Sequence, residues 1–286
     1  MPSRRAPARR EPRAPEENRS PGSLLNPKSR SPPVVEIEPL VQPPRLFAHE
    51  DADAAFDLED DQVRVYVVDL AAGIEGDRFA ESAEWEWLSP AERARAERLV
   101  RPRDGRRFVR CRGALRTILG RLLDLPAAAV AFQTGPGGKP VLPRVEDAPN
   151  RRALHFNVSH SGELALIAVS RRRELGVDVE MTRPISQAER IVQSYFTEAE
   201  QAEFLAVAEA DRPAAFIRGW TRKEAILKAQ GVGLAGLATG FETRFGAGGV
   251  GREFVRCAPH PTVLGWALWE VAPRPGYVAA LAVAGG

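Results

Sequence analysis

The order of hydrophobic and polar positions divides the chain into helix-like and strand-like segments. Between residues 104 and 123, apolar side chains recur every three or four positions, which is the spacing of one helix face and predicts a long helix. Residues 63–70 are rich in β-branched side chains, which predicts a strand. On similar grounds we predict strands at residues 130–134, 154–159, 164–170, 176–180, 240–245, 264–271 and 277–283.

Start signals predict four more helices. Ser89, Pro90 and Glu92 have the spacing of a capping box with a proline in the first turn, so a helix is expected to run to about residue 100. Thr197 and Glu200 repeat the capping-box spacing and open a helix that ends near residue 208. Helices are also expected at residues 185–196 and 213–231.

These elements run helices then strands twice over, which predicts an α+β fold of two similar halves that meet near residue 174. We therefore place an N-terminal half at residues 61–174 and a C-terminal half at residues 175–286. Residues 1–60 combine a stretch rich in Pro, Arg and Ser with an acidic segment. Because large apolar side chains are few there, we expect a disordered tail and lead-in.

Composition narrows the classes of function. The 40 Lys and Arg residues nearly balance the 38 Asp and Glu residues, for a net charge of +2, which argues against a bulk nucleic-acid binder. Two cysteines are too few for a disulfide framework, so we expect a cytoplasmic protein. The longest apolar run, residues 277–284, is too short to span a bilayer, so no membrane association is expected.

Two carboxylates alternate with valines in the strand predicted at residues 176–180. Asp178 and Glu180 then share one face of the strand, and Val177 and Val179 share the other. Neighbouring carboxylates repel each other unless a cation lies between them, and Mg²⁺ usually takes one or two carboxylates together with substrate phosphates. The alternative is a half-exposed strand with a polar outer face.

A second candidate site lies on the last predicted helix. Phe216, Trp220, Glu224 and Lys228 are spaced four residues apart and line one face, so Glu224 continues an apolar stripe. An acid in that position needs a partner, namely Lys228, a metal ion or both. The alternative is a surface Glu–Lys pair that contributes about 0.3–0.5 kcal/mol.

Polar donors gather between two predicted strands, at residues 156–162. Ser159, His160 and Ser161 can together donate several hydrogen bonds to a phosphate. A Ser–His hydrolase would use such residues too. However, the Gly-x-Ser-x-Gly elbow that would carry the nucleophile is absent, because residue 157 is Asn.

Basic residues add further phosphate-binding candidates. Lys139 follows a glycine-rich turn and can bind phosphate as a point charge, although Pro140 after it excludes a Walker A loop. An arginine cluster on the two helices predicted around residues 90–123 forms a basic patch, and the alternative is a solvated face. The cluster comprises Arg93, Arg95, Arg98, Arg101, Arg103, Arg106, Arg107, Arg110, Arg112 and Arg116.

Taken in order, these motifs resemble those of the Sfp-type 4′-phosphopantetheinyl transferases. The resemblance is strong from residue 63 to about residue 240 and weak in the last strands. It rests on Leu-Ser-Pro at residues 88–90, Gly-Lys-Pro at 138–140, Phe-Asn-x-Ser-His-Ser at 156–161, Gly-Val-Asp-Val-Glu at 176–180 and Trp-x-x-Lys-Glu-Ala-x-x-Lys at 220–228. Each motif alone is moderately specific, and all of them in this order are very specific.

The resemblance implies a fold and a reaction. The fold would be two similar α/β halves related by a pseudo-twofold axis, with the active site between them. The reaction would transfer the 4′-phosphopantetheine arm of coenzyme A to a serine of an apo acyl or peptidyl carrier protein. It would require Mg²⁺ and release adenosine 3′,5′-bisphosphate. Fatty-acid, polyketide and nonribosomal-peptide carriers are all open, and a monomer is expected.

The resemblance also implies roles for single residues. The Mg²⁺ ligands would be Asp178, Glu180 and Glu224. The residues in contact with coenzyme A would be Arg93, Arg98, Arg107, Lys139, Ser159, His160 and Lys228. The catalytic residues would be Lys228, His160 and Glu224, the last also serving as base for the carrier serine. Two rival functions stay open: a binding protein without turnover, and a Ser–His hydrolase insensitive to EDTA.

Overall fold

The structure is a computed structural model that describes residues 45–48, 58–72, 78–135, 138–143, 154–232, 240–246, 253–255 and 265–285. All of these belong to one compact unit that spans residues 36–286. The tail expected at residues 1–60 therefore lies outside the described residues, except for 45–48 and 58–60. Most of the loop at residues 143–152 and the middle of the glycine-rich turn, residues 136 and 137, lie outside them as well.

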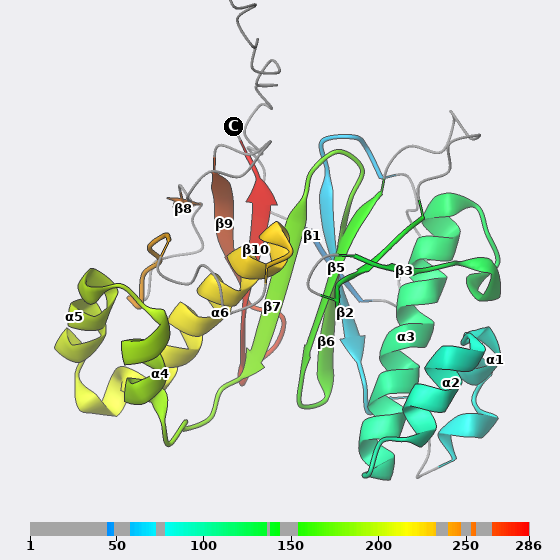
Figure 1. Cartoon of the computed structure of the whole chain (residues 1–286), viewed down its shortest axis with the longest axis horizontal. Helices are drawn as coiled ribbons and strands as arrows, with labels where there is room; N and C mark the ends of the chain where they lie inside the picture. The colour runs from blue at the N-terminus through cyan, green and yellow to red at the C-terminus, as the bar shows by residue number, and fades with distance from the viewer. Residues whose placement is uncertain are drawn as a thin grey trace, which may run out of the picture. The chain divides into compact units, whose positions relative to one another are not determined.

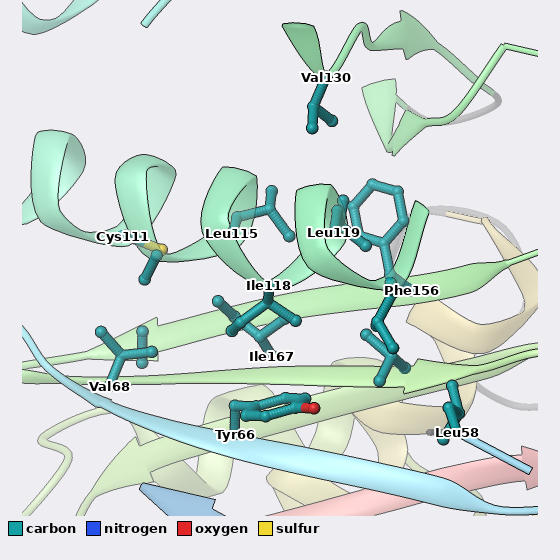
Figure 2. Close-up of a cluster of buried hydrophobic side chains, with 14 of the residues drawn as sticks. Leu58, Tyr66, Val68, Cys111, Leu115, Ile118, Leu119, Val130, Phe156 and Ile167 are labelled. Carbon is teal, nitrogen blue, oxygen red and sulfur yellow. The ribbon is translucent and has the colours of Figure 1, made fainter. Parts of the chain in front are cut away.

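The N-terminal half is built on a four-stranded sheet in the order β1-β2-β6-β5 (Figure 1). Its strands are Arg45–Ala48 (β1), Val63–Asp69 (β2), His155–Ser161 (β5) and Leu164–Ser170 (β6). The long helix α3, Pro102–Leu123, packs on one face of this sheet. Figure 2 shows Leu115, Ile118 and Leu119 of α3 above side chains of β2, β5 and β6. The apolar period read from the sequence is therefore the buried stripe of α3.

The C-terminal half repeats this arrangement with the sheet order β7-β10-β9-β8. Its strands are Leu175–Met181 (β7), Glu253–Val255 (β8), Trp266–Val271 (β9) and Tyr277–Ala284 (β10). In each half the first long strand pairs antiparallel with the second strand of a later hairpin, β2 with β6 and β7 with β10. Helix α6, Arg212–Gln230, packs on β7 and β10. The predicted α+β fold of two similar halves is confirmed.

Shorter helices precede each long helix. They are Ala83–Trp87 (α1) and Pro90–Glu97 (α2) before α3, and Ala188–Tyr195 (α4) and Glu198–Ala206 (α5) before α6. Both predicted capping boxes are present, at the start of α2 and of α5. Short 3₁₀ turns lie at Phe79–Glu81, Ala127–Ala129 and Glu209–Asp211. Within the described residues, no helix is long and apolar enough to cross a membrane.

An apolar core joins the two sheets. Side chains of β2 and β6 meet side chains of β7, β9 and β10 there, and Val177 and Val179 of β7 are fully buried among them. Gly176, next to Val177, faces helix α6 instead, since a Cβ on it would lie 2.2 Å from the Ala225 carbonyl oxygen. Alternation along β7 then places Asp178 on the side of the strand that faces α6.

The strand predicted at residues 240–245 is wrong, because residues 240–246 have no regular secondary structure. Side chains of α5 bind the main chain of this segment. The Thr243 N–H donates to Glu200 Oε1 at 2.7 Å. The N–H groups of Phe245 and Gly246 each donate to Glu203 Oε1 at 3.1 Å. These donors are satisfied without a neighbouring strand, so Phe241, Thr243 and Phe245 are buried although the segment joins no sheet.

The strand predicted at residues 130–134 is mostly wrong. Only Gln133–Thr134 (β3) is extended, and it pairs with Pro140–Val141 (β4) in a two-stranded ribbon. Val130 instead ends a 3₁₀ turn, and its carbonyl accepts a hydrogen bond of 2.7 Å from Arg116. The sequence pattern also missed β1, β4, β8 and α1. None of them is longer than five residues, too short to show a clear period.

Candidate active site

The candidate site forms where β5 and β7, an edge strand of each sheet, lie side by side. Side chains at three alternate positions of β5 each accept a hydrogen bond from a main-chain N–H of β7. These pairs are Asn157 with Val177 (2.9 Å), Ser159 with Val179 (3.3 Å) and Ser161 with Met181 (3.1 Å). We call Asn157, Ser159 and Ser161 the side-chain ladder. It joins the halves at the point where the predicted site residues meet.

Asp178 is held by one of its two oxygens. Its Oδ1 atom accepts hydrogen bonds from Ser159 Oγ at 2.8 Å and from Lys228 Nζ at 2.6 Å. Lys228 Nζ also donates to Ser159 Oγ at 2.9 Å, which closes a three-membered network. The side chain of Asp178 is buried, and no described residue makes a hydrogen bond to its Oδ2 atom. The alternative of a half-exposed strand with a polar outer face is therefore wrong at Asp178.

Glu180 lies two residues beyond Asp178 on β7, and it too accepts a hydrogen bond from a serine of the side-chain ladder. Ser161 Oγ donates to its Oε2 atom at 2.7 Å. Partial burial and the nearby charge of Asp178 raise the pKa of Glu180, while the Ser161 hydrogen bond and the cation of Lys228 act in the opposite direction. The charge of Asp178 thus adds to the effect of burial, and a cation between the two carboxylates would relieve their repulsion.

Glu224 reaches the same place from helix α6. The apolar stripe before it is real, since Phe216 stacks on Trp220 with ring centroids 6.0 Å apart. The Glu224 Oε1 atom is buried and has no hydrogen-bond partner within the part of the chain that the structure describes. Burial, followed by the charges of Asp178 and Glu180, raises the pKa of Glu224 to about 7. Lys228 pairs with Asp178 rather than with Glu224, so the surface Glu–Lys pair is excluded.

These carboxylates fit a hard cation, although they do not form a closed metal cage. Among the described residues, no group of three His, Cys, Asp or Glu side chains is arranged to hold a metal ion. Mg²⁺ does not need one, because it usually binds one or two carboxylates together with substrate phosphates and water. The buried, unpartnered oxygens of Asp178 and Glu224 are the atoms that such an ion would satisfy.

Lys139 lies beside the site but contacts main chain. Its Nζ atom donates to the carbonyls of Leu175 at 3.3 Å and of Lys228 at 3.0 Å. The β3–β4 ribbon is thereby tied to the start of β7 and to the last turn of α6. Burial and the positive charge of Lys228 together lower the pKa of Lys139 to about 8, against the opposing charge of Glu174.

His160 is exposed on β5, next to the side-chain ladder. Partial desolvation of the ring and the positive charges of Lys228, Arg107 and Arg95 lower its pKa, which favours neutral imidazole near pH 7. Successive strand residues point to opposite faces, so Ser159 and His160 diverge. The Ser159 hydroxyl contacts Asp178 and Lys228 instead, which is not the arrangement of a Ser–His hydrolase.

Arg107 is the one predicted coenzyme-contacting arginine that joins separate elements near the site. It donates from Nε and Nη2 to both oxygens of Glu163, at 3.1 and 2.6 Å, and from Nη1 to Asp104 at 3.3 Å. Glu163 lies in the turn between β5 and β6. The fork lowers the pKa of Glu163 and links α3 to that turn.

The other arginines are more dispersed than the predicted patch. Arg93 donates to the Trp85 carbonyl at 3.0 Å and lies over its ring, and Arg98 is exposed at the end of α2. Arg112 and Arg116 are engaged by the buried Glu92. Much of the cluster therefore supports the packing of α1, α2 and α3, and the single basic patch is not what forms.

Sequence reasoning assigned no role to Asn157 and considered Ser161 only as a phosphate donor, so the contacts of both with β7 were missed. A signal for them exists. Polar residues occupy every second position at 157, 159 and 161 in a strand whose other positions include Phe156 and Val158. That alternation marks a strand with one polar side. It does not reveal that the polar side faces the edge of a second sheet.

Sequence models of one family match both halves of the chain. The model described as 4′-phosphopantetheinyl transferase, N-terminal, matches residues 80–172. The model described as the 4′-phosphopantetheinyl transferase superfamily matches residues 174–282. The second match contains β7 and α6, and hence Asp178, Glu180, Glu224 and Lys228.

Curated relatives carry the same description. The chain is 35% identical over 246 residues to the 4′-phosphopantetheinyl transferase HetI of Nostoc sp., which covers 86% of this chain and 93% of HetI. It is 30% identical over 149 residues to Sfp of Bacillus subtilis, covering 52% and 62%. It is 30% identical over 183 residues to the human L-aminoadipate-semialdehyde dehydrogenase-phosphopantetheinyl transferase, covering 58% and 59%.

Proposed function

Because the chain belongs to the 4′-phosphopantetheinyl transferase family, we propose that its reaction takes place at the junction of β5, β7 and α6 and requires Mg²⁺. Members of this family move the phosphopantetheine arm of coenzyme A to a serine of a carrier protein. One observation carries this placement. Asp178 and Glu180 of β7 lie near enough to Glu224 of α6 to add to the effect of burial on its pKa, and among the described residues Asp178 and Glu224 each keep a buried oxygen without a hydrogen-bond partner. A dianionic pyrophosphate and its cation would satisfy such a site.

In this proposal Asp178, Glu180 and Glu224 hold the Mg²⁺, which neutralises charge on the pyrophosphate when it is bound. Lys228 is oriented by Asp178 and Ser159, so its ammonium is presented from a fixed position to a phosphate oxygen. Phosphoryl transfer depends mainly on such positioning and charge neutralisation.

Glu224 serves as the base in the proposed mechanism, directly or through a water molecule. The serine oxygen forms a bond to the β-phosphorus of coenzyme A while the bond from that phosphorus to the adenosine 3′,5′-bisphosphate oxygen breaks. The serine proton goes to Glu224. Glu224 suits this step because its buried Oε1 atom has no hydrogen-bond partner among the described residues and is therefore open to accept a proton.

Neutral His160, Lys139 and Ser159 complete the proposed coenzyme pocket, with Arg93, Arg98 and Arg107 toward its 3′-phosphate or adenine end. The tether of Lys139 to main-chain carbonyls leaves it a smaller part in phosphate binding than the motif alone suggests. Arg107 would have to exchange its fork with Glu163 for a phosphate. Lys228 is thus the side chain best placed for phosphate contact, whereas His160 points to the other side of β5 from Ser159.

The acceptor is proposed to be an apo acyl or peptidyl carrier protein, from fatty-acid, polyketide or nonribosomal-peptide synthesis. We also propose that the enzyme is a cytoplasmic monomer, with halves near residues 61–174 and 175–286. Support for the monomer comes from the site itself, because both β5 and β7, one from each half, contribute to it within one chain.

The test is an intact-mass assay of carrier modification. The protein is incubated with coenzyme A, Mg²⁺ and a panel of apo-carriers, and each carrier is weighed before and after. The wild type should add one phosphopantetheine, and EDTA should abolish the addition. Asp178→Asn should lose at least about 100-fold in rate, whereas Glu189→Gln, a surface carboxylate paired with Arg212, should keep it. Full activity in EDTA or in Asp178→Asn would refute the metal assignment.

A further inference from the structure

The side-chain ladder has a regular register that separates its three members by what else they touch. Each ladder residue binds the main-chain N–H of the residue twenty positions later in the chain. Asn157 makes no further hydrogen bond to a carboxylate among the described contacts. Ser159 and Ser161 each donate to a carboxylate of β7 as well. Two of the three therefore connect the join between the halves to the acids of the site.

Ser159 and Ser161 differ in a second respect. The Asp178 oxygen bound by Ser159 is also bound by Lys228, so Asp178 keeps a strong partner if Ser159 is removed. The only hydrogen bond that the described residues provide to a Glu180 oxygen comes from Ser161, at 2.7 Å. Ser161 is in turn fixed by the Met181 N–H at 3.1 Å. The Ser161 hydroxyl therefore donates to the Glu180 carboxylate and accepts from the Met181 N–H.

We infer that Ser161 is a positioning residue that aims Glu180 into the site. The inference rests on the proposed function, since it assumes that Glu180 binds a divalent cation. Ser161 holds the Oε2 atom of Glu180, which restricts the side-chain torsions and presents the carboxylate in one orientation. Without this bond, a glutamate at the half-exposed end of β7 would sample several rotamers, and binding of a cation would have to order it.

The physical expectation follows from how metal sites behave in general. Residues that hydrogen-bond a ligand fix its direction, and their removal typically costs about 10–100-fold in metal affinity. The bond from Ser161 also stabilises the ionised form of Glu180, as its effect on the Glu180 pKa shows. Ser161→Ala should therefore weaken cation binding about tenfold or more without removing any ligand.

The experiment measures binding of Mn²⁺ alone, by electron paramagnetic resonance, in the absence of coenzyme A. Mn²⁺ accepts the same oxygen ligands as Mg²⁺. Ser161→Ala should weaken Mn²⁺ binding about tenfold, and Ser161→Thr, which keeps the hydroxyl, should restore it. If Ser161→Ala does not fold, Ser161→Cys, with its weaker donor, should show a smaller loss in the same direction.

Asn157→Ala is the matched control. It removes a ladder member of the same kind but no contact to a carboxylate, so it should lower the melting temperature and leave Mn²⁺ affinity unchanged. Glu180→Gln should itself weaken Mn²⁺ binding. The double variant Ser161→Ala/Glu180→Gln should bind Mn²⁺ no more weakly than Glu180→Gln alone, because Ser161 acts through Glu180.

The outcomes distinguish a failure of the positioning role of Ser161 from a failure of the proposed metal site. Wild-type Mn²⁺ affinity in Ser161→Ala, together with a loss in Glu180→Gln, overturns the positioning role and leaves the metal site standing. An additive loss in the double variant also overturns it, because Ser161 would then act independently of Glu180. Wild-type affinity in both Glu180→Gln and Asp178→Asn overturns the metal assignment, and the positioning role with it.

Discussion

Replacing Glu224 with glutamine should stabilise the metal-free protein at alkaline pH while it abolishes turnover. The reason lies in the environment of the carboxylate. Its pKa rises from 4.5 to about 7 because it is partly buried and faces Asp178 and Glu180. The folded state therefore binds a proton more tightly than the unfolded state. Stability from this group is complete below pH 4.5 and is lost as pH rises through 7.

The magnitude follows from the same shift. Each pKa unit corresponds to 1.36 kcal/mol, so moving from 4.5 to about 7 amounts to at most about 3 kcal/mol. Partial access of solvent to Glu224 reduces this figure. Glutamine carries no charge, so Glu224→Gln removes the cost. Between pH 5 and pH 8, the stability of the variant relative to the wild type should therefore rise by about 2 kcal/mol.

The assay is urea denaturation of both proteins at pH 5 and pH 8 in EDTA, followed by the same pair at pH 8 with Mg²⁺. Comparing the two proteins at each pH removes most of the contributions of His160 and Lys139, which titrate in both. The repulsion between Glu180 and Glu224 is part of what the comparison measures. At pH 8 with Mg²⁺, the free energies of unfolding of the two proteins should lie closer together, because the cation offsets the repulsion between the carboxylates of the wild type. A difference that does not change between pH 5 and pH 8 would refute the reasoning about Glu224.

Two further changes test the scaffold around the site. Gly176→Ala places a methyl group about where the main chain of α6 already lies, 2.2 Å from the Ala225 carbonyl oxygen, so it should destabilise the fold by about 3 kcal/mol or more, as read by chemical denaturation. Lys223→Met should cost about 3–5 kcal/mol, because it leaves Glu200 without its fully buried cation at 2.6 Å. The surface variant Glu189→Gln should change stability by less than about 1 kcal/mol in the same assay.

The fold was predictable from the sequence where one pattern dominates. The apolar stripe of α3 and the β-branched run of β2 lie on either side of one core, so period and burial agree. The capping boxes at Ser89 and Thr197 formed as read, because their hydrogen bonds are local. Residues 240–245 failed for the opposite reason. Their alternating apolar pattern is real, but carboxylates and a lysine from distant helices took the main-chain groups.

The candidate site was predictable in its residues and not in its connections. The alternation of Asp178 and Glu180 with valines correctly implied a shared face, since the valines are buried between the sheets. Helical spacing left open whether Glu224 pairs with Lys228, with a metal ion or with both, and it could not show that Asp178 on another element offers Lys228 a buried partner at 2.6 Å. Residue spacing within one helix cannot show that a residue of another element competes for the same partner. The tether of Lys139 to the carbonyls of β7 and α6 escaped prediction for the same reason.

The main chain of residues 243–246 depends on carboxylates for protection from solvent exchange. Its amides at Thr243, Phe245 and Gly246 donate to side chains of α5 rather than to a neighbouring strand. In a sheet, an amide becomes exchangeable when a strand separates. Here it becomes exchangeable whenever Glu200 or Glu203 rotates away. Deuterium uptake in this segment therefore reports the docking of α5 on the segment, and during folding these amides can become protected only after α5 has packed against it.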